Sequence, residues 1–190
     1  MRLDRSMVVD SIQALWIIWA AYWLVNAFGN KRSVYRQSVL RGFFYRVIVV
    51  GAIVVLFSVG SHKNPIFSET VWTQIGGVVL CAAGIGLAIW ARRILGTNWS
   101  GLITLKENHE LIRHGPYRFV RHPIYSGVIL AMIGTVLAIQ PFLQGLAVLA
   151  ILAIALKLKS LGEEKLMMSQ FPDSYPRYKN EVKSLIPFVL

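Results

Sequence analysis

The chain has 190 residues, of which 55% are hydrophobic, and carries a formal net charge of +11. Its mean hydropathy of +0.55 is too high for an ordinary soluble domain, and its basic residues are clustered between apolar stretches. A high positive charge can also indicate nucleic-acid binding, but the chain contains no recognisable nucleic-acid motif, so we expect these residues to contact lipid headgroups and to set topology. The single cysteine, Cys81, excludes an intrachain disulfide framework. The composition predicts a polytopic membrane protein.

Five apolar segments are candidates for membrane-spanning helices, when compared with the ~20 residues that cross a bilayer core as a helix. The first has a long apolar core and is followed directly by a basic block, so we expect an anchor and not a cleaved signal peptide. The last two are short and are separated only by Gln140 and Pro141, which predicts a tight helical hairpin. Glycines 76, 77, 84 and 86 in the third segment predict close approach between helices. The five segments are residues 8–28, 42–60, 72–90, 124–139 and 142–156.

The distribution of Lys and Arg predicts an orientation. These residues are concentrated after the first, third and fifth apolar segments, and the alternate connections contain almost none. By the positive-inside rule, the N-terminus should lie outside and the C-terminus in the cytoplasm. The basic stretch after the third segment and the C-terminal tail should then share one membrane face. No organelle address is visible, so a prokaryotic plasma membrane is the simplest location.

A polar stretch, HGPYRFVRHPIYSG, occupies residues 114–127 between two apolar segments. His122 precedes a proline and should be extended, whereas Pro123 suits the first position of a helix. Free backbone N–H groups around Ile124 and Tyr125 would then form a site for a carboxylate or a phosphate. The preceding Gly-Pro-Tyr turn should fold Tyr117 towards the same place. The alternative is a juxtamembrane loop whose arginines contact lipid headgroups.

Two adjacent carboxylates, Glu163 and Glu164, follow the last apolar segment in an otherwise basic protein. They could bind a cationic or hydroxyl-rich ligand. The alternative is a solvated helix end at which they pair with Lys159 or Lys165 at helical spacing. The four histidines do not have the spacing of zinc ligands, so no metal site is expected.

Taken together, these motifs resemble the isoprenylcysteine carboxyl methyltransferase family and its relatives among the integral-membrane phospholipid methyltransferases. The resemblance covers roughly residues 98–178, and its motifs are specific in combination. They are His109-Glu110-Leu111-Ile112, Gly115-Pro116-Tyr117, Arg121-His122-Pro123-Ile124-Tyr125 with Gly127, Glu163-Glu164, and Phe171 with Tyr175 and Tyr178.

The resemblance implies a membrane-embedded methyltransferase that uses S-adenosyl-L-methionine. Together with the apolar segments and the charge distribution, it leads us to expect an all-α bundle of five transmembrane helices in a single membrane domain, residues 1–190, with a three-span part (1–91) and a part (92–190) that holds a cytoplasmic-face cofactor pocket. Lys159 stands where the family has an arginine beside the methyl acceptor; lysine keeps the charge but lacks the planar fork that grips a carboxylate. The residues that the resemblance assigns to the cofactor are His109, Glu110, Leu111, Ile112, Tyr117, His122, Pro123, Ile124, Tyr125 and Glu163.

The residues themselves suit this cofactor. Its methionine carboxylate fits a helix N-terminus at Pro123, its amino group and ribose hydroxyls fit Glu163, and its adenine and sulfonium fit the rings of Tyr117 and Tyr125. A carboxylate or thiolate acceptor needs no strong base, whereas an amine or phenol needs a proton acceptor, for which His122 or Glu164 is the candidate. We therefore expect Lys159 and Glu164 to be the catalytic residues.

The acceptor and the partners remain open at this point. We expect a lipophilic or lipidated acceptor that enters from the bilayer, contact with membrane lipids, and no nucleic acid. A prenylated cysteine, an amino-phospholipid, and a quinone-like or terpenoid compound all fit, and the oligomeric state cannot be read from the sequence. Two alternatives belong to other classes: a membrane-embedded NADPH-dependent sterol-type reductase, and a non-catalytic lipid-binding module. Binding of reduced nicotinamide in place of the sulfonium cofactor would indicate the reductase.

Overall fold

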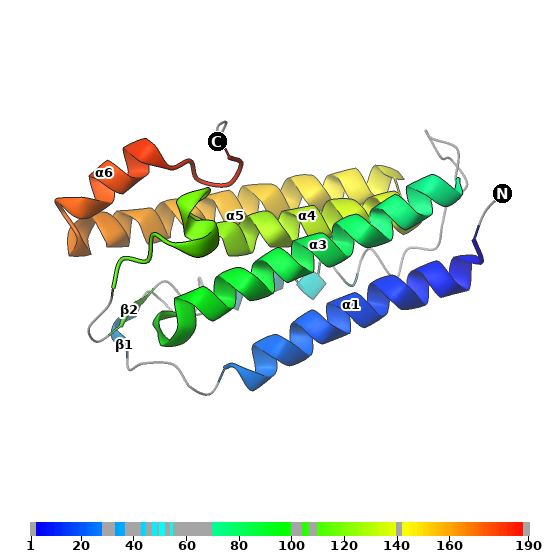
Figure 1. The fold of residues 1–190 in the computed structure, drawn as a ribbon, viewed down its shortest axis with the longest axis horizontal. Coiled ribbons are helices and arrows are strands. Elements are labelled where there is room, and N and C mark those ends of the chain that lie inside the picture. Colours follow the sequence, from blue (N-terminus) through cyan, green and yellow to red (C-terminus); the bar gives the residue numbers. More distant parts are fainter. Residues whose placement is uncertain are drawn as a thin grey trace.

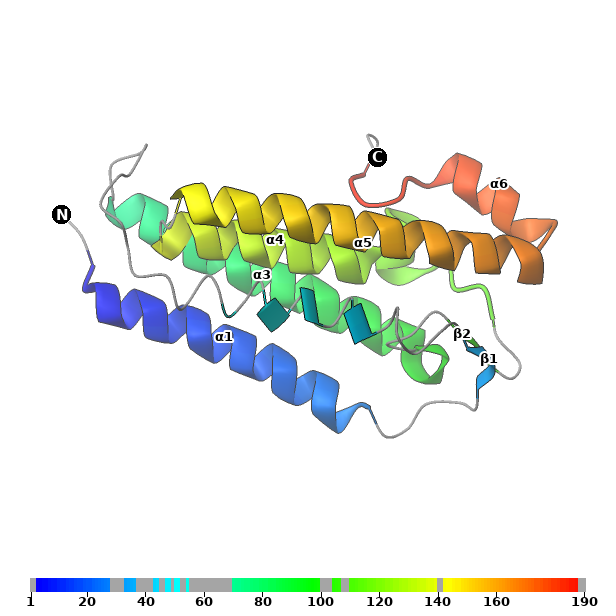
Figure 2. The same cartoon turned by 180° about the vertical axis from the view of Figure 1, so that it is seen from behind.

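The computed structural model describes residues 3–27, 33–36, 43–44, 47–48, 50–51, 54, 70–99, 104–106, 110–139 and 142–187. Four long helices run along this part of the molecule, and a short helix, α6, packs at one end (Figure 1). Helices α4 and α5 lie side by side over much of their length in both views, and α1 lies against α3 (Figure 2). The helices are α1 (Arg5–Val25), α3 (Val71–Leu95), α4 (Pro123–Ile139), α5 (Phe142–Gln170) and α6 (Ser174–Glu181).

Polar side chains set the helix ends. The carboxylate of Asp4 accepts a hydrogen bond from the Ser6 N–H at 3.0 Å and caps α1. A capping box between Thr70 and Thr73 begins α3. At the other end of α3, the guanidinium of Arg92 donates to the carbonyl oxygens of Gly96 (2.6 Å) and Asn26 (2.8 Å), so one cation satisfies the carboxyl ends of both α1 and α3.

Helices α3 and α4 meet through small residues. A Cβ atom added to Gly127 would lie 2.6 Å from the carbonyl oxygen of Gly84, and one added to Gly77 would lie 2.7 Å from that of Gly134. Any larger side chain would therefore force the helices apart, as in small-residue membrane interfaces. The prediction of close approach is confirmed for glycines 77 and 84, whereas glycines 76 and 86 have no atom within 4 Å of an added Cβ.

The core lies between α1, α3, α4 and α5. Val8, Ile12 and Trp16, spaced one turn apart on α1, face it. The indole N–H of Trp16 donates to the Thr135 hydroxyl of α4 at 3.0 Å, and that hydroxyl donates to the carbonyl of Ala131 at 2.9 Å. The polar side chains of Trp16 and Thr135 are thus paired in this core, whereas the buried indole N–H of Trp19, packed against it, has no hydrogen-bond partner among the described residues.

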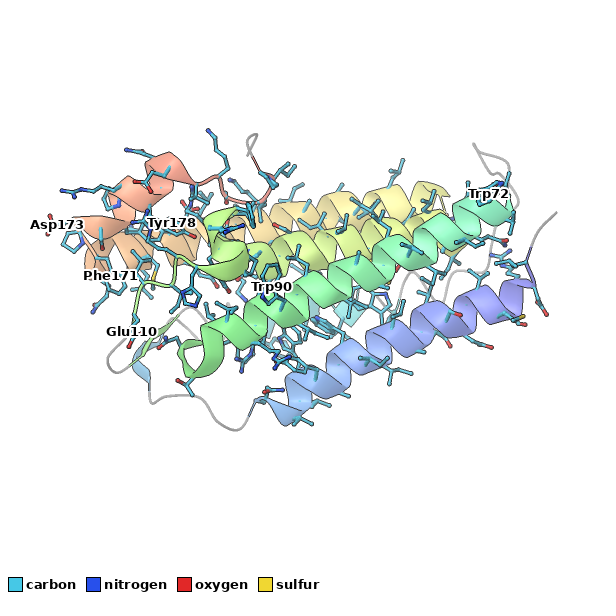
Figure 3. All side chains as sticks on the ribbon, viewed as in Figure 1. Trp72, Trp90, Glu110, Phe171, Asp173 and Tyr178 are labelled. Atoms are coloured by element: carbon cyan, nitrogen blue, oxygen red, sulfur yellow. The ribbon has the colours of Figure 1, made fainter. Side chains whose placement is uncertain are left out.

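Three described helical segments are long and apolar enough to cross a bilayer: Arg5–Val25, Val71–Asn98 and Gln144–Gln170; Pro123–Ile139 is apolar but shorter. Two exposed tryptophans, Trp72 and Trp90, lie towards opposite ends of α3 (Figure 3). Their separation of 18 positions corresponds to about 27 Å along a helix, close to the ~30 Å of the hydrocarbon core. This is the placement typical of aromatic anchors at the two membrane interfaces.

The predicted helical bundle is confirmed in the part of the chain that the structure describes, with two differences. Helix α5 does not end near residue 156 but continues to Gln170, so the glutamate pair lies on the same helix as the last apolar segment. A small antiparallel pair of strands, β1 (Ser33–Arg36) and β2 (Thr104–Lys106), was not predicted. The second predicted span lies mostly outside the described residues, and its described positions 43–44, 47–48, 50–51 and 54 are helical.

Candidate functional site

The polar stretch predicted as the site begins α4, at the end of the bundle where α6 packs (Figure 1). Helix α4 starts at Pro123, as predicted. The expectation of free N–H groups at this helix start is wrong for Tyr125, because its backbone N–H donates to the carbonyl of His122 at 3.0 Å. The N–H of Ser126 donates to the same oxygen at 3.1 Å. The backbone N–H groups of Tyr125 and Ser126 are therefore already hydrogen-bonded within the helix start and are not free to bind an anion.

A segment that follows α6 holds this helix start from the outside. The backbone N–H of Arg121 donates to the carbonyl of Lys183 at 2.8 Å, and that of His122 donates to the carbonyl of Ser184 at 3.0 Å. One turn into α4, the Ser126 hydroxyl donates to the carbonyl of Leu185 at 2.5 Å. Three successive carbonyls of the C-terminal segment thus fix residues 121–126, although almost 60 residues separate the two stretches.

Glu164 is buried in a cluster of cationic groups. Its side chain is 2% exposed, and its Oε1 atom accepts hydrogen bonds from Arg121 Nη2 at 2.7 Å and Nε at 3.2 Å. The Nε2 atom of His122 lies 3.2 Å from the same oxygen, and Lys179 Nζ of α6 lies 3.0 Å from Oε2. A buried carboxylate needs such partners, because leaving it unpaired away from water costs several kcal/mol or more.

Glu163 has different surroundings. Its side chain is 24% exposed, and its Oε1 atom accepts a 2.6 Å hydrogen bond from the Tyr125 hydroxyl. His122 Nδ1 lies 3.5 Å from Oε2, and Lys159 Nζ, one helical turn earlier on α5, lies 4.0 Å from Oε1. The rings of His122 and Tyr125 are parallel, with centroids 5.5 Å apart. Glu163 is thus a partly exposed carboxylate held by protein donors, able to meet a ligand.

His122 bridges the two carboxylates through its two ring nitrogens. Burial by itself would lower its pKa, but hydrogen bonds to Glu163 and Glu164 outweigh burial and raise the pKa above its ordinary value. With a carboxylate at each nitrogen, the doubly protonated ring satisfies both contacts, which a neutral ring cannot do. The geometry therefore favours an imidazolium between the two glutamates.

Two buried tyrosines connect α6 to the segment before α4. Tyr117, in the short 3₁₀ turn η2 (Gly115–Arg118), points to α3 and donates to the carbonyl of Ala91 at 3.4 Å. Tyr178 of α6 donates to the carbonyl of Tyr117 at 2.5 Å. Burial raises the pKa of Tyr178 to about 12, so its hydroxyl stays protonated and remains a donor at neutral pH. Tyr117 lies between α3 and α6, and among the described residues its hydroxyl is not hydrogen-bonded to Glu163 or Glu164.

The structure brings together five of the predicted site residues: His122, Tyr125, Lys159, Glu163 and Glu164. Pro123 is buried at the helix start and Ile124 is half-buried. Glu110 is exposed at this end of the molecule (Figure 3), and Leu111 and Ile112 are half-buried; among the described residues, none of these three is hydrogen-bonded to the glutamate pair. His109 lies outside the described residues.

Sequence reasoning missed two of the three cationic residues around Glu164. Arg121 was noted as a positive charge and as part of the family motif, and Lys179 as one of the basic residues of the C-terminal tail, but neither was assigned to the site. Both contact Glu164 from other parts of the chain, Arg121 from the segment before α4 and Lys179 from α6. Residue spacing along the chain does not predict contacts of this kind. The alternative of a solvated helix end is correct in pairing Lys159 with Glu163 at helical spacing, but wrong for Glu164, whose side chain is buried.

Long apolar helices with interfacial tryptophans, closed at one end by a buried charged cluster, define an integral membrane protein with a polar site at one end of a helical bundle. The isoprenylcysteine carboxyl methyltransferase (ICMT) family matches residues 75–170, half of the chain, and the chain belongs to this family. The match includes α4 and the glutamate pair on α5.

Individual relatives agree with this assignment. The chain is 32% identical over 96 residues to a protein-S-isoprenylcysteine O-methyltransferase of Schizosaccharomyces pombe, a match that covers 50% of this chain and 41% of the relative. It is 26% identical over 170 residues to a probable protein-S-isoprenylcysteine O-methyltransferase of Oryza sativa subsp. indica, with 88% of each chain covered. It is also 27% identical over 147 residues to the cobalt-zinc-cadmium resistance protein CzcN of Cupriavidus metallidurans, with 74% of this chain and 63% of the relative covered.

These relatives support the methyltransferase interpretation and give no support to the reductase or to the non-catalytic lipid-binding module. A relative named for metal resistance shares a similar percentage of identical residues over a shorter stretch, so family membership does not by itself define the acceptor.

Proposed function

We propose that the protein transfers a methyl group from S-adenosyl-L-methionine to a lipophilic acceptor at the membrane, and that the acceptor group is a carboxylate, as on a prenylated cysteine. The observation that carries this proposal is the Glu163 carboxylate, held by Tyr125 and His122 beside Lys159 within the segment that matches the ICMT family. Family membership supports the reaction class, and the four side chains suggest how the chain could perform it.

The donor set fits the proposed cofactor. S-adenosyl-L-methionine carries an ammonium group and ribose hydroxyls, and a partly exposed carboxylate can accept hydrogen bonds from them. The orientation of the Glu163 carboxylate is fixed by the 2.6 Å hydrogen bond that it accepts from the Tyr125 hydroxyl. The adjacent parallel rings of His122 and Tyr125 offer a flat surface next to that carboxylate. The proposed cofactor-binding residues are His109, Glu110, Leu111, Ile112, Tyr117, His122, Pro123, Ile124, Tyr125 and Glu163.

When bound, the cofactor would supply a methyl group on a positively charged sulfur, from which a nucleophilic oxygen of the acceptor can displace it. The residues of this chain would bind and orient both partners and exclude water, since positioning provides most of the rate in such a transfer. The C-terminal segment that fixes residues 121–126 contributes to this preorganisation, because it removes backbone freedom at the site.

Lys159 is the residue proposed to contact the acceptor. Its side chain is 14% exposed, and its ammonium nitrogen lies 4.0 Å from Glu163 Oε1 and 5.3 Å from the centre of the Tyr125 ring. The neighbouring outward positions of α5 are apolar and exposed, among them Leu158 and Leu161, so a lipophilic molecule in the bilayer would lie close to Lys159. An acceptor carboxylate would be drawn to this ammonium and would enter from the bilayer.

Glu164 was predicted to be catalytic with Lys159. Its enclosure by three cationic groups favours a different role, in which it positions its partners and does not contact the acceptor. A carboxylate acceptor is already a nucleophile and needs no proton acceptor, so the proposed reaction does not require Glu164 to take a proton.

We also propose that the site faces the cytoplasm. Three elements that carry some of the basic residues predicted to lie inside, β2, η2 and α6, lie at the end of the bundle that carries the site, and α1 begins at the opposite end (Figure 1). By the positive-inside rule, the N-terminus would then be outside.

The decisive experiment is calorimetric binding of S-adenosylhomocysteine to the purified protein in detergent, with NADPH as a parallel titrant and His122→Ala as the site variant. We expect the wild type to bind S-adenosylhomocysteine, NADPH to give no heat, and the variant to lose binding. Binding of NADPH alone would contradict the proposal and restore the reductase alternative. Absence of binding heat with both ligands would contradict the proposal and favour the non-catalytic lipid-binding module.

A further inference from the structure

Helix α6 reaches the buried site through one side chain. Tyr175 and Tyr178 pack the helix against the bundle, and Lys179 extends to α5, where its Nζ atom lies 3.0 Å from Glu164 Oε2. The other carboxylate oxygen, Oε1, is occupied by Arg121 and by His122. The two oxygens of Glu164 therefore have separate partners, and Lys179 is the described partner of Oε2.

This division of partners has a mechanical consequence. Rotation about the Cγ–Cδ bond moves both carboxylate oxygens, so a carboxylate held at both oxygens resists rotation more strongly than one held at Oε1 alone. Rotation would move the oxygen against which His122 Nε2 rests at 3.2 Å. Because the same imidazole contacts Glu163 through Nδ1, a shift of the ring would also change the support of the Glu163 carboxylate.

We propose that Lys179 is a positioning residue, which fixes the Glu164 carboxylate from α6 and thereby holds His122 against Glu163. This inference rests on the proposed function, because Glu163 is the proposed cofactor-binding carboxylate. It assigns a role to a tail residue that makes no contact with Glu163 in the described structure.

Removal of this side chain should leave α6 in place. The backbone carbonyl of Lys179 accepts a 3.0 Å hydrogen bond from Arg121 Nη1, which does not depend on the lysine side chain. The Tyr178 hydroxyl holds the carbonyl of Tyr117 independently. Without the Lys179 side chain, which is 39% exposed, the Glu164 carboxylate still keeps Arg121 and His122 as partners of Oε1 and is not left unpaired. A substitution here therefore tests orientation of the site separately from folding.

The test compares Lys179→Gln, Lys179→Arg and the wild type by calorimetric titration with S-adenosylhomocysteine. Arg177→Gln is the matched control, because it removes one positive charge from an exposed position of the same helix. We expect Lys179→Gln to raise Kd about fivefold, because ion pairs with a partly exposed partner contribute modest interaction energies. Lys179→Arg should restore Kd to about that of the wild type, and the control should leave it unchanged.

Stoichiometry separates positioning from a purely structural role. A positioning role raises Kd while the number of sites per protein stays constant; a structural role lowers the number of competent sites and leaves their Kd unchanged. An unchanged Kd in Lys179→Gln, with or without a loss of sites, would overturn this inference while the proposed function stands. Absence of binding in the wild type would overturn the proposed function and this inference together.

Discussion

The Tyr125 hydroxyl donates a 2.6 Å hydrogen bond to Oε1 of Glu163 and so joins α4 to α5 at the proposed cofactor site. Charge-assisted bonds of this kind are shorter and stronger than those between neutral groups. Glu163 is a quarter exposed, so the bond fixes the orientation of a carboxylate that remains accessible. The relationship links a family motif at the start of α4 to a single acidic residue 38 positions later.

Substitution of Tyr125 by Phe should weaken binding of S-adenosylhomocysteine by about tenfold, because one hydrogen bond to a charged group is lost while the ring is kept. Calorimetric titration in detergent measures this change. Tyr22→Phe removes a hydroxyl from α1, a helix that carries none of the proposed cofactor-binding residues, and should leave Kd unchanged. Equal affinity of Tyr125→Phe and the wild type would show that this hydroxyl does not orient the cofactor-binding carboxylate.

Lys159→Ala should reduce turnover with a farnesylated N-acetylcysteine by about 100-fold, because a cation beside the reacting carboxylate is removed. Its 4.0 Å contact with Glu163 is long and partly exposed, so S-adenosylhomocysteine affinity should change by less than about fivefold. Lys159→Arg should keep or increase turnover, since its fork can grip a carboxylate. Transfer of radiolabelled methyl to the acceptor measures turnover. Loss of cofactor affinity in the alanine variant would instead place Lys159 on the cofactor side.

His122 should make stability depend on pH. Its pKa in the folded protein is raised above the unfolded value of about 6.5, because hydrogen bonds to Glu163 and Glu164 outweigh burial. A raised pKa contributes stability fully below the unfolded pKa, and the contribution is lost as pH rises through the folded pKa. The difference in Tm between the wild type and His122→Gln should therefore be largest below the unfolded pKa and shrink as pH rises above it through the raised pKa of the folded protein. A difference that does not change with pH would rule out an imidazolium between the two carboxylates.

The α3–α4 contact predicts a contrast between two glycines. Gly127→Ala places a methyl group 2.6 Å from the carbonyl oxygen of Gly84 and should destabilise the bundle by about 1–3 kcal/mol. Gly86→Ala adds a methyl group where no atom lies within 4 Å, and should be neutral or slightly stabilising because alanine is the better helix former. Thermal unfolding in the same detergent compares the two. Equal effects would mean that helix packing at Gly127 tolerates a side chain.

Much of the architecture follows from local properties of the chain. Hydropathy and length placed the described apolar helices to within a few residues at most ends, because a membrane helix satisfies its own backbone hydrogen bonds. The Pro123 helix start followed from the fixed φ of proline. The motif residues that carry the family resemblance likewise stand in short stretches, and the match over residues 75–170 includes most of them.

The surroundings of the site were decided by tertiary structure. The sequence could show that Glu163 and Glu164 are adjacent, but consecutive helical positions point in directions about 100° apart. Packing therefore leaves Glu163 partly exposed to solvent and buries Glu164 among Arg121, His122 and Lys179. The C-terminal segment that holds residues 121–126 acts through backbone carbonyls, which every residue possesses. No side-chain pattern marks such contacts, so the sequence alone determined which chemical groups are present, and only the fold decided which of them meet.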